Sequence, residues 1–120
     1  MNLRQFRYAT DNLGYLIYGQ QHAIAIDGGA VQEMLAFLGA NRLKLIAVTN
    51  THTHPDHTSG NTALVQATGA ALVEIPQLLQ TGRLDLEGRA IEVRHTPGHS
   101  ADSVVFYYDD VLISGDTPSR

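Results

Sequence analysis

Four side chains able to bind a metal ion are crowded into residues 52–57, shortly after an apolar run. That run, L-K-L-I-A-V at residues 43–48, lacks the clean alternation of a half-exposed strand, and this is typical of a strand buried on both faces. The segment T-H-T-H-P-D-H at 51–57 follows it and has no helical or strand periodicity. Open α/β sheets build their sites where such strands end. The chain is therefore expected to fold so that a buried strand delivers these polar groups to one end of a sheet.

The spacing within this segment indicates metal binding. Residues two apart in an extended backbone point to the same side, so His52 and His54 can reach one cation. Pro55 prevents a regular strand from continuing and turns the chain, so that Asp56 and His57 can reach a second cation nearby. Imidazole and carboxylate together suit zinc, iron or manganese. The alternative is a solvated polar loop, which would be the better interpretation of a single histidine but not of this cluster.

Two further polar motifs each follow a β-rich run. In T-P-G-H-S at 96–100, the Pro-Gly pair predicts a tight turn that presents His99 at the end of a strand. In S-G-D-T at 114–117, Asp116 lies beside a glycine, again directly after such a run. Each motif alone is better explained as an ordinary surface turn, but three such motifs at strand ends are far more specific together.

The remaining sequence predicts one small α/β domain. Strands are expected over residues 3–9, 13–18, 23–26, 43–48, 71–75, 83–86, 89–95, 103–108 and 111–114, and helices over 30–38 and 60–68, with one helical turn at 76–80. Strands that alternate with helices on this scale favour a layered α/β architecture. With 120 residues and no linker-like segment, residues 1–120 are expected to form a single domain.

Composition excludes several classes of protein. The absence of cysteine excludes disulfides, thiolate zinc sites, iron–sulfur clusters and a cysteine nucleophile. Eight Lys and Arg against 12 Asp and Glu give a formal charge of −4, which argues against a nucleic-acid binder with a basic surface. The sequence contains neither an apolar run long enough to cross a membrane nor the apolar region of a signal peptide. We therefore expect a cytoplasmic protein with no nucleic-acid or membrane partner.

In this order and with these gaps, the three motifs resemble those of the metallo-β-lactamase superfamily. The resemblance extends over about residues 13–117 and is greatest to stand-alone hydrolases of the glyoxalase II type. His54 stands where flavodiiron oxygen reductases carry glutamate, and no exosite rich in Lys and Arg is visible, which argues against the redox and transfer-RNA-processing branches. The resemblance implies an α/β fold of the αββα sandwich type. About one half of it would be present here, as a mixed β-sheet with helices on one face.

The resemblance also implies a ligand set for two divalent metal ions. His52, His54 and His99 would hold the first ion, and Asp56 and His57 would hold the second. Zinc is the expected metal, with iron or manganese as alternatives, because sites built from His and Asp accept several first-row ions.

Further roles follow from the same resemblance. Asp116 would bridge the two ions, and a hydroxide between them would be the nucleophile, which Asp56 could orient. Asp27, in I-D-G-G at 26–29, matches a family aspartate that supports the histidine loop, although a plain turn former is an equally good interpretation. Ser103 matches a small hydroxyl residue that is expected to be structural. His22 matches no ligand position and is expected to be a surface histidine.

The resemblance covers only part of the family sandwich. The chain ends just after Asp116, and the family's last histidine ligand and its substrate-binding residues have no counterpart in it. A half-sandwich would expose an apolar sheet face, so we expect a homodimer or a higher oligomer.

Three functions stay open at this point. The first is a metal-dependent hydrolase that acts on a thioester or small ester through a metal-bound hydroxide. The second is a mononuclear iron dioxygenase of the persulfide type, and the third is a half-length metal-binding domain without activity. A small-molecule substrate is expected, but the sequence does not identify it.

Overall fold

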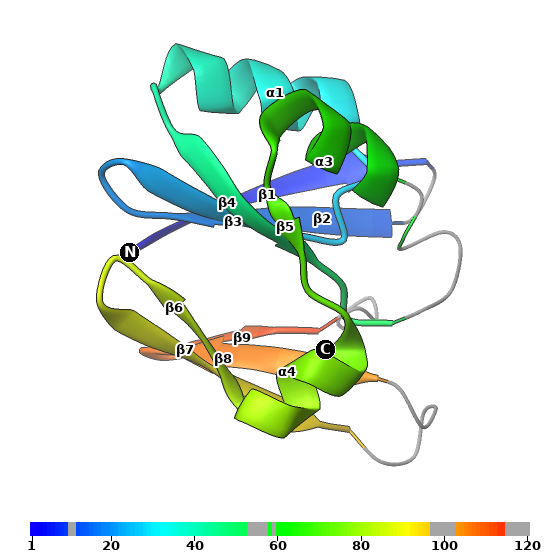
Figure 1. The fold of residues 1–120 in the computed structure, drawn as a ribbon, viewed down its shortest axis with the longest axis vertical. Helices are drawn as coiled ribbons and strands as arrows, with labels where there is room; N and C mark the ends of the chain where they lie inside the picture. Colours follow the sequence, from blue (N-terminus) through cyan, green and yellow to red (C-terminus); the bar gives the residue numbers. More distant parts are fainter. Residues whose placement is uncertain (10–11, 53–57, 59, 97–102, 115–120) are drawn as a thin grey trace.

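The computed structural model describes residues 1–9, 12–52, 58, 60–96 and 103–114. In this part of the chain, two β-sheets face each other, and helices α1 and α3 cover the outer face of the first sheet (Figure 1). The first sheet has the strand order β1-β2-β3-β4-β5, and the second has the order β6-β7-β8-β9. The expected partial αββα architecture, with a mixed sheet and helices on one of its faces, is confirmed.

The elements follow the sequence closely. The first sheet consists of β1 (Asn2–Tyr8), β2 (Asn12–Tyr18), β3 (His22–Ile26), β4 (Lys44–Thr49) and β5 (Ala71–Leu72). The second consists of β6 (Arg83–Leu86), β7 (Arg89–His95), β8 (Val104–Tyr108) and β9 (Val111–Ile113). The helices are α1 (Val31–Ala40), α3 (Asn61–Thr68) and α4 (Ile75–Thr81). None of the helices in the described ranges is long and apolar enough to span a membrane.

The central strands of the first sheet are buried on both faces, as the apolar run at 43–48 predicts for β4. The pairs β1–β2 and β2–β3 are antiparallel, whereas β3–β4 and β4–β5 are parallel. Neighbouring residues of β2 point to opposite sides, so Leu16 packs under the helices and Ile17 packs between the two sheets. In β4, Val48 faces the helices and Ala47 faces the second sheet. The parallel β4 thus has both faces covered, which is the usual environment of such a strand.

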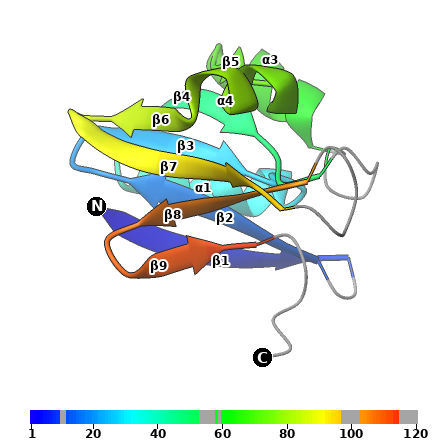
Figure 2. The same ribbon diagram turned by 90° about the horizontal axis from the view of Figure 1, so that it is seen from below.

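The second sheet is covered on one face only by the described residues. In β7, Ile91 and Val93 point into the core between the sheets, whereas Glu92 and Arg94 point outward. Leu112 of β9 is 62% exposed on the outward face, and Figure 2 shows no helix of the described residues in front of β8 and β9. The chain thus supplies both facing sheets itself, and no described residue covers the outer face of the second sheet.

The segment between β5 and the second sheet differs from the expectation. We predicted a strand over 71–75, but β5 ends at Leu72 and α4 begins at Ile75. Pro76 is favourable in the first turn of a helix, because its missing N–H would have no partner there. Gly82 ends the helix in the left-handed conformation, with φ 74°. Ile75 and Leu78 enter the core between the sheets, so tertiary burial decides this boundary.

A carboxylate joins the two sheets at the end where β7 begins. Glu87, in the β6–β7 turn, accepts hydrogen bonds from the backbone N–H groups of Gln20 (3.0 Å), Gln21 (2.8 Å) and His22 (2.8 Å) in the β2–β3 turn. Its Oε2 also lies 3.0 Å from Nδ1 of His22. Gly19 allows this approach, because a Cβ there would collide with the carboxylate. Hydrogen bonds from Gln21 and Gln20, and then from His22, lower the pKa of Glu87 to about 2.

The Glu87 contact should make stability depend on pH in the acid range. A carboxyl group whose pKa is lowered in the folded state stabilises the fold above its ordinary pKa of 4.5, and this contribution is lost as the pH falls through about 2. We therefore expect E87Q to be less stable than the parent chain at pH 7 and to lose less stability between pH 4.5 and pH 2. Urea unfolding at several pH values measures this. D110N, in the exposed β8–β9 turn, is the control, and identical pH profiles of E87Q and the parent chain would contradict the prediction.

Candidate metal centre

The end of β4 carries the first motif into a buried position. Asn50, Thr51 and His52 follow the strand, and His52 is only 7% exposed. Of the predicted ligands, His52 alone lies within the described residues. The others, His54, Asp56, His57, His99 and Asp116, lie outside them, so their placement stays a prediction. Within the described part of the chain, no three His, Asp or Glu side chains come together.

Asp27 holds this segment in place. It is fully buried, directly after β3, with φ 55° in the left-handed region. Its Oδ1 accepts hydrogen bonds from the Thr51 N–H (2.9 Å) and from Nδ2 of Asn50 (3.3 Å), and its Oδ2 accepts one from the Thr51 hydroxyl (2.6 Å). Its own carbonyl accepts a bond from the Gly29 N–H (2.9 Å). Asp27 therefore forms a turn and also holds Asn50 and Thr51, at the start of the histidine motif.

These bonds determine which nitrogen of His52 carries its proton. The single hydroxyl hydrogen of Thr51 is donated to Asp27, so Oγ can only accept from Nδ1 of His52, which lies 3.0 Å away. Nδ1 is then the protonated nitrogen, and Nε2 carries the lone pair. A neutral imidazole oriented through its other nitrogen is the form in which histidine binds metal ions in proteins. His52 thus fits the role of a metal ligand.

Neutral polar residues extend this network, and sequence reasoning missed them. Asn50 Oδ1 accepts a hydrogen bond of 2.8 Å from Nδ2 of Asn61, the first residue of α3. Gly60 packs against the carbonyl of Gly28, and a side chain at position 60 would place its Cβ in collision with that carbonyl. The signal in the sequence was the polar pair Asn50-Thr51 directly after a run buried on both faces. Buried polar side chains need hydrogen-bond partners, so this pair was the signal from which the network could have been predicted.

The two strands that precede the other two motifs, β7 and β9, terminate at the same end of the sandwich. β7 and β9 are both antiparallel to β8, so they run in the same direction and end on the same side of the second sheet. The Thr96 N–H donates to the carbonyl of Ser103 (3.1 Å), and the Val104 N–H donates to the carbonyl of Thr51 (2.9 Å). The second bond joins the two sheets directly beside His52. Ser103 is buried and makes a backbone contact, in keeping with a structural role.

Comparison with known proteins gives the family and its curated relatives. Residues 9–82 match the sequence model described as the metallo-beta-lactamase superfamily. The chain is 37% identical over 118 residues to the hydroxyacylglutathione hydrolase of Methylobacillus flagellatus, a match that covers 89% of this chain and 47% of the relative. The protein of that name from Albidiferax ferrireducens is 34% identical over 122 residues, with coverages of 90% and 48%. The chain thus spans about half the length of the curated relatives it matches.

Solved structures give the same fold. ETHE1 from Myxococcus xanthus is similar with a TM-score of 0.74 and 25% identity, over 89% of this chain and 53% of that one. The BLEG-1 B3 metallo-beta-lactamase is similar with a TM-score of 0.73 and 22% identity, over 89% of this chain and 67% of that one. The second likeness shows the fold alone.

The hydrogen-bonded chain from Asp27 through Thr51 to His52 predicts the effect of removing one hydroxyl. In T51V, Asp27 loses one donor and Nδ1 of His52 loses its acceptor. We expect the free energy of unfolding to fall by about 1–3 kcal/mol. We also expect zinc affinity to fall by about tenfold to a hundredfold. Urea unfolding and calorimetric zinc titration measure the two effects.

The matched control for this variant is T62V, because Thr62 is exposed on α3. The same replacement there should leave both quantities nearly unchanged. Equal effects of T51V and T62V would show that the Thr51 hydroxyl does not support His52.

Proposed function

Because the chain belongs to the metallo-beta-lactamase superfamily, we propose that it acts as a metal-dependent hydrolase on a thioester or other small ester. The observation that carries this proposal is the hydrogen-bonded chain from Asp27 to His52, which orients a buried imidazole for metal binding. Relatives named hydroxyacylglutathione hydrolase, 31–37% identical, support an acylated thiol as the class of substrate.

We propose two metal ions, held as the family resemblance implies. His52, His54 and His99 would hold the first, and Asp56 and His57 would hold the second. Asp27 and Thr51 would fix the ring of His52 from behind. Zinc is the metal that these donors suit best, and iron or manganese would fit the same set.

The chemistry then divides between the ions and the chain. When bound, the ions would lower the pKa of a water molecule toward neutrality and polarise the carbonyl oxygen of the substrate. Asp116 would bring the two ions together, and Asp56 would orient the attacking water by accepting its hydrogen bond. The buried Asp27 carboxylate would keep the Nε2 lone pair of His52 directed at the ion.

Metal analysis and a thioester assay test this proposal. We expect H54A to lose metal more completely than H57A, because His54 belongs to the site with three histidines. H22A, which changes a histidine at the opposite end of the sandwich, should keep the metal content of the parent chain. Two ions per chain together with thioester hydrolysis would support the hydrolase. One iron per chain would favour the dioxygenase, and bound metal without turnover under any condition would favour the inactive metal-binding domain.

We also propose that the chain forms a homodimer through the outer face of the second sheet. Leu112 is 62% exposed there, and Val105 and Tyr107 of β8 are partly exposed on the same face. An exposed apolar patch on a sheet favours association, and a twofold dimer would bury it against its own copy.

A charge placed on this face should weaken the association. We expect L112K to shift the chain toward a monomer, because burying an unpaired ammonium group is unfavourable. L79K, at a leucine of α4 that is 41% exposed, should leave the oligomeric state unchanged. Light scattering measures the mass, and a stable monomer of about 13.0 kDa for the parent chain would contradict the proposal.

A further inference from the structure

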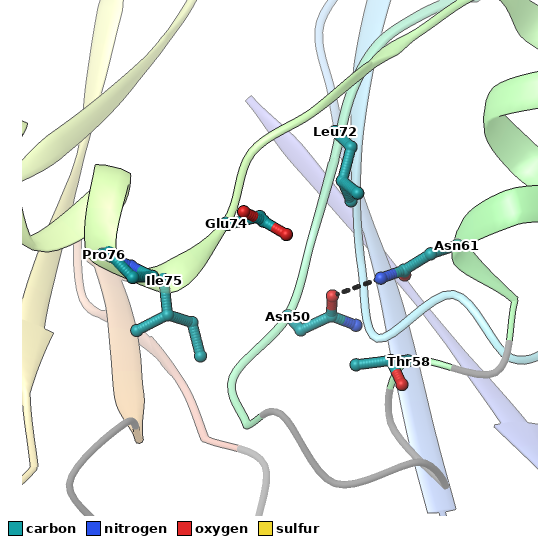
Figure 3. A pocket seen from close by; sticks show the side chains of 7 residues that line it. All are labelled: Asn50, Thr58, Asn61, Leu72, Glu74, Ile75 and Pro76. Atoms are coloured by element: carbon teal, nitrogen blue, oxygen red, sulfur yellow. Dashed lines mark hydrogen bonds between the residues drawn. The ribbon is translucent and has the colours of Figure 1, made fainter.

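A pocket of about 250 Å³ opens beside the end of β4, between the first turns of α3 and α4 (Figure 3). Among the residues that the structure describes, none of the predicted metal ligands lines it. Its walls come from Asn50, Thr58, Asn61, Leu72, Glu74, Ile75 and Pro76. Two of these, Asn50 and Thr58, lie on either side of the segment 53–57, so the pocket is built next to the histidine motif.

The polar side of the pocket is rich in hydrogen-bond acceptors. Asp27 can only accept hydrogen bonds, so the amide of Asn50 turns its Nδ2 toward Asp27 and its Oδ1 toward Asn61. Asn61 must then donate through Nδ2, which leaves its Oδ1 buried without a hydrogen-bond partner. A buried acceptor without a partner is unfavourable, and a donor that reached it would remove that penalty.

Glu74 adds a negative charge to the same pocket. Its carboxylate points from the start of α4 into the space in front of Asn50 (Figure 3). It forms no ion pair with any of the described residues, and the described part of the lining includes no Lys or Arg. This part of the lining therefore offers a carboxylate and a neutral acceptor, with no positive charge to balance them.

The opposite side of the pocket is apolar. Leu72 is 43% exposed although it is a large aliphatic side chain, and Ile75 and Pro76 lie beside it in the lining. Apolar walls with a few directed polar groups are typical of small-molecule sites.

We propose that this pocket binds the ammonium group of a small primary amine, with its aliphatic part against Leu72 and Pro76. An ammonium group carries three donors and no acceptor. It could therefore pair with the Glu74 carboxylate and, with a small shift of the Asn61 side chain that uncovers its buried Oδ1, donate to that atom as well. The proposal does not depend on the hydrolase activity, because it uses none of the metal ligands.

An anion is the competing ligand, because α3 and α4 both begin at the pocket and helix N-termini favour negative charge. At α4, however, Glu74 occupies the N-cap position and already supplies a negative charge. A second anion would lie close to this carboxylate and be repelled by it. The charge of the lining therefore favours the ammonium ion.

Titration of the ¹⁵N-labelled chain with three probes of equal chain length tests the proposal. The probes are n-butylammonium chloride, n-butanol and sodium n-butyrate, at constant ionic strength. We expect saturable shifts of the side-chain amide signals of Asn50 and Asn61 with n-butylammonium, with a Kd of about a millimolar, as is reasonable for so few atoms. E74Q should weaken this binding about fivefold, which is the effect of losing an exposed ion pair.

The control variant is E33Q, which removes one exposed carboxylate from the first turn of α1 and should leave the binding unchanged. Glu74 is also exposed, so E74Q should fold, and the dispersion of its amide spectrum verifies this. The proposal would be overturned by tighter or equal binding of n-butyrate or n-butanol. Shifts that do not saturate, or equal effects of E74Q and E33Q, would overturn it as well.

Discussion

The buried carboxylate of Asp27 is the interaction on which the histidine-bearing end of this sandwich depends. A fully buried negative charge is costly unless hydrogen bonds satisfy it, and Asp27 takes them from Asn50 and Thr51 in the segment that follows β4. The segment must therefore pass directly over Asp27, and this fixes His52 beside it. The same charge affects Tyr15. Burial of its side chain raises the pKa of the Tyr15 hydroxyl, and the negative charge of Asp27 raises it further. Tyr15 therefore stays a neutral phenol at physiological pH.

The two ends of the sandwich use the same chemistry for different purposes. At each end, a carboxylate accepts hydrogen bonds from the backbone of a segment distant in the sequence: Asp27 at one end and Glu87 at the other. The Glu87 contact joins two turns and thereby holds the sheets together. At the Asp27 end, the bonds continue through Thr51 to His52 and through Asn50 to Asn61. The second of these branches reaches the pocket, so the histidine motif and the pocket share one buried acceptor.

The sequence predicted those features that depend on local pattern. The apolar runs identify β2, β3 and β4 as strands, the run of β4 indicates burial on both faces, and the polar motif after β4 indicates a site at its end. What the pattern could not show were contacts between distant residues. Glu87-Gly88 is recognisable as a turn, but its bonds to residues 20–22 span more than 60 positions. The boundary at Ile75 likewise depends on burial between the sheets, and the roles of Asn50 and Asn61 depend on the hydrogen bond from Asn50 to Asp27, which is distant in the sequence.

The tautomer of His52 in the metal-free chain tests this account most directly. Two-bond ¹H–¹⁵N correlation spectra at neutral pH distinguish a protonated ring nitrogen from one that carries a lone pair. Because the Thr51 hydroxyl donates to Asp27, we predict that Nδ1 of His52 is protonated and that Nε2 carries the lone pair. A ring protonated at Nε2 and not at Nδ1 would contradict the account, because Asp27 would then not orient His52 for a metal ion.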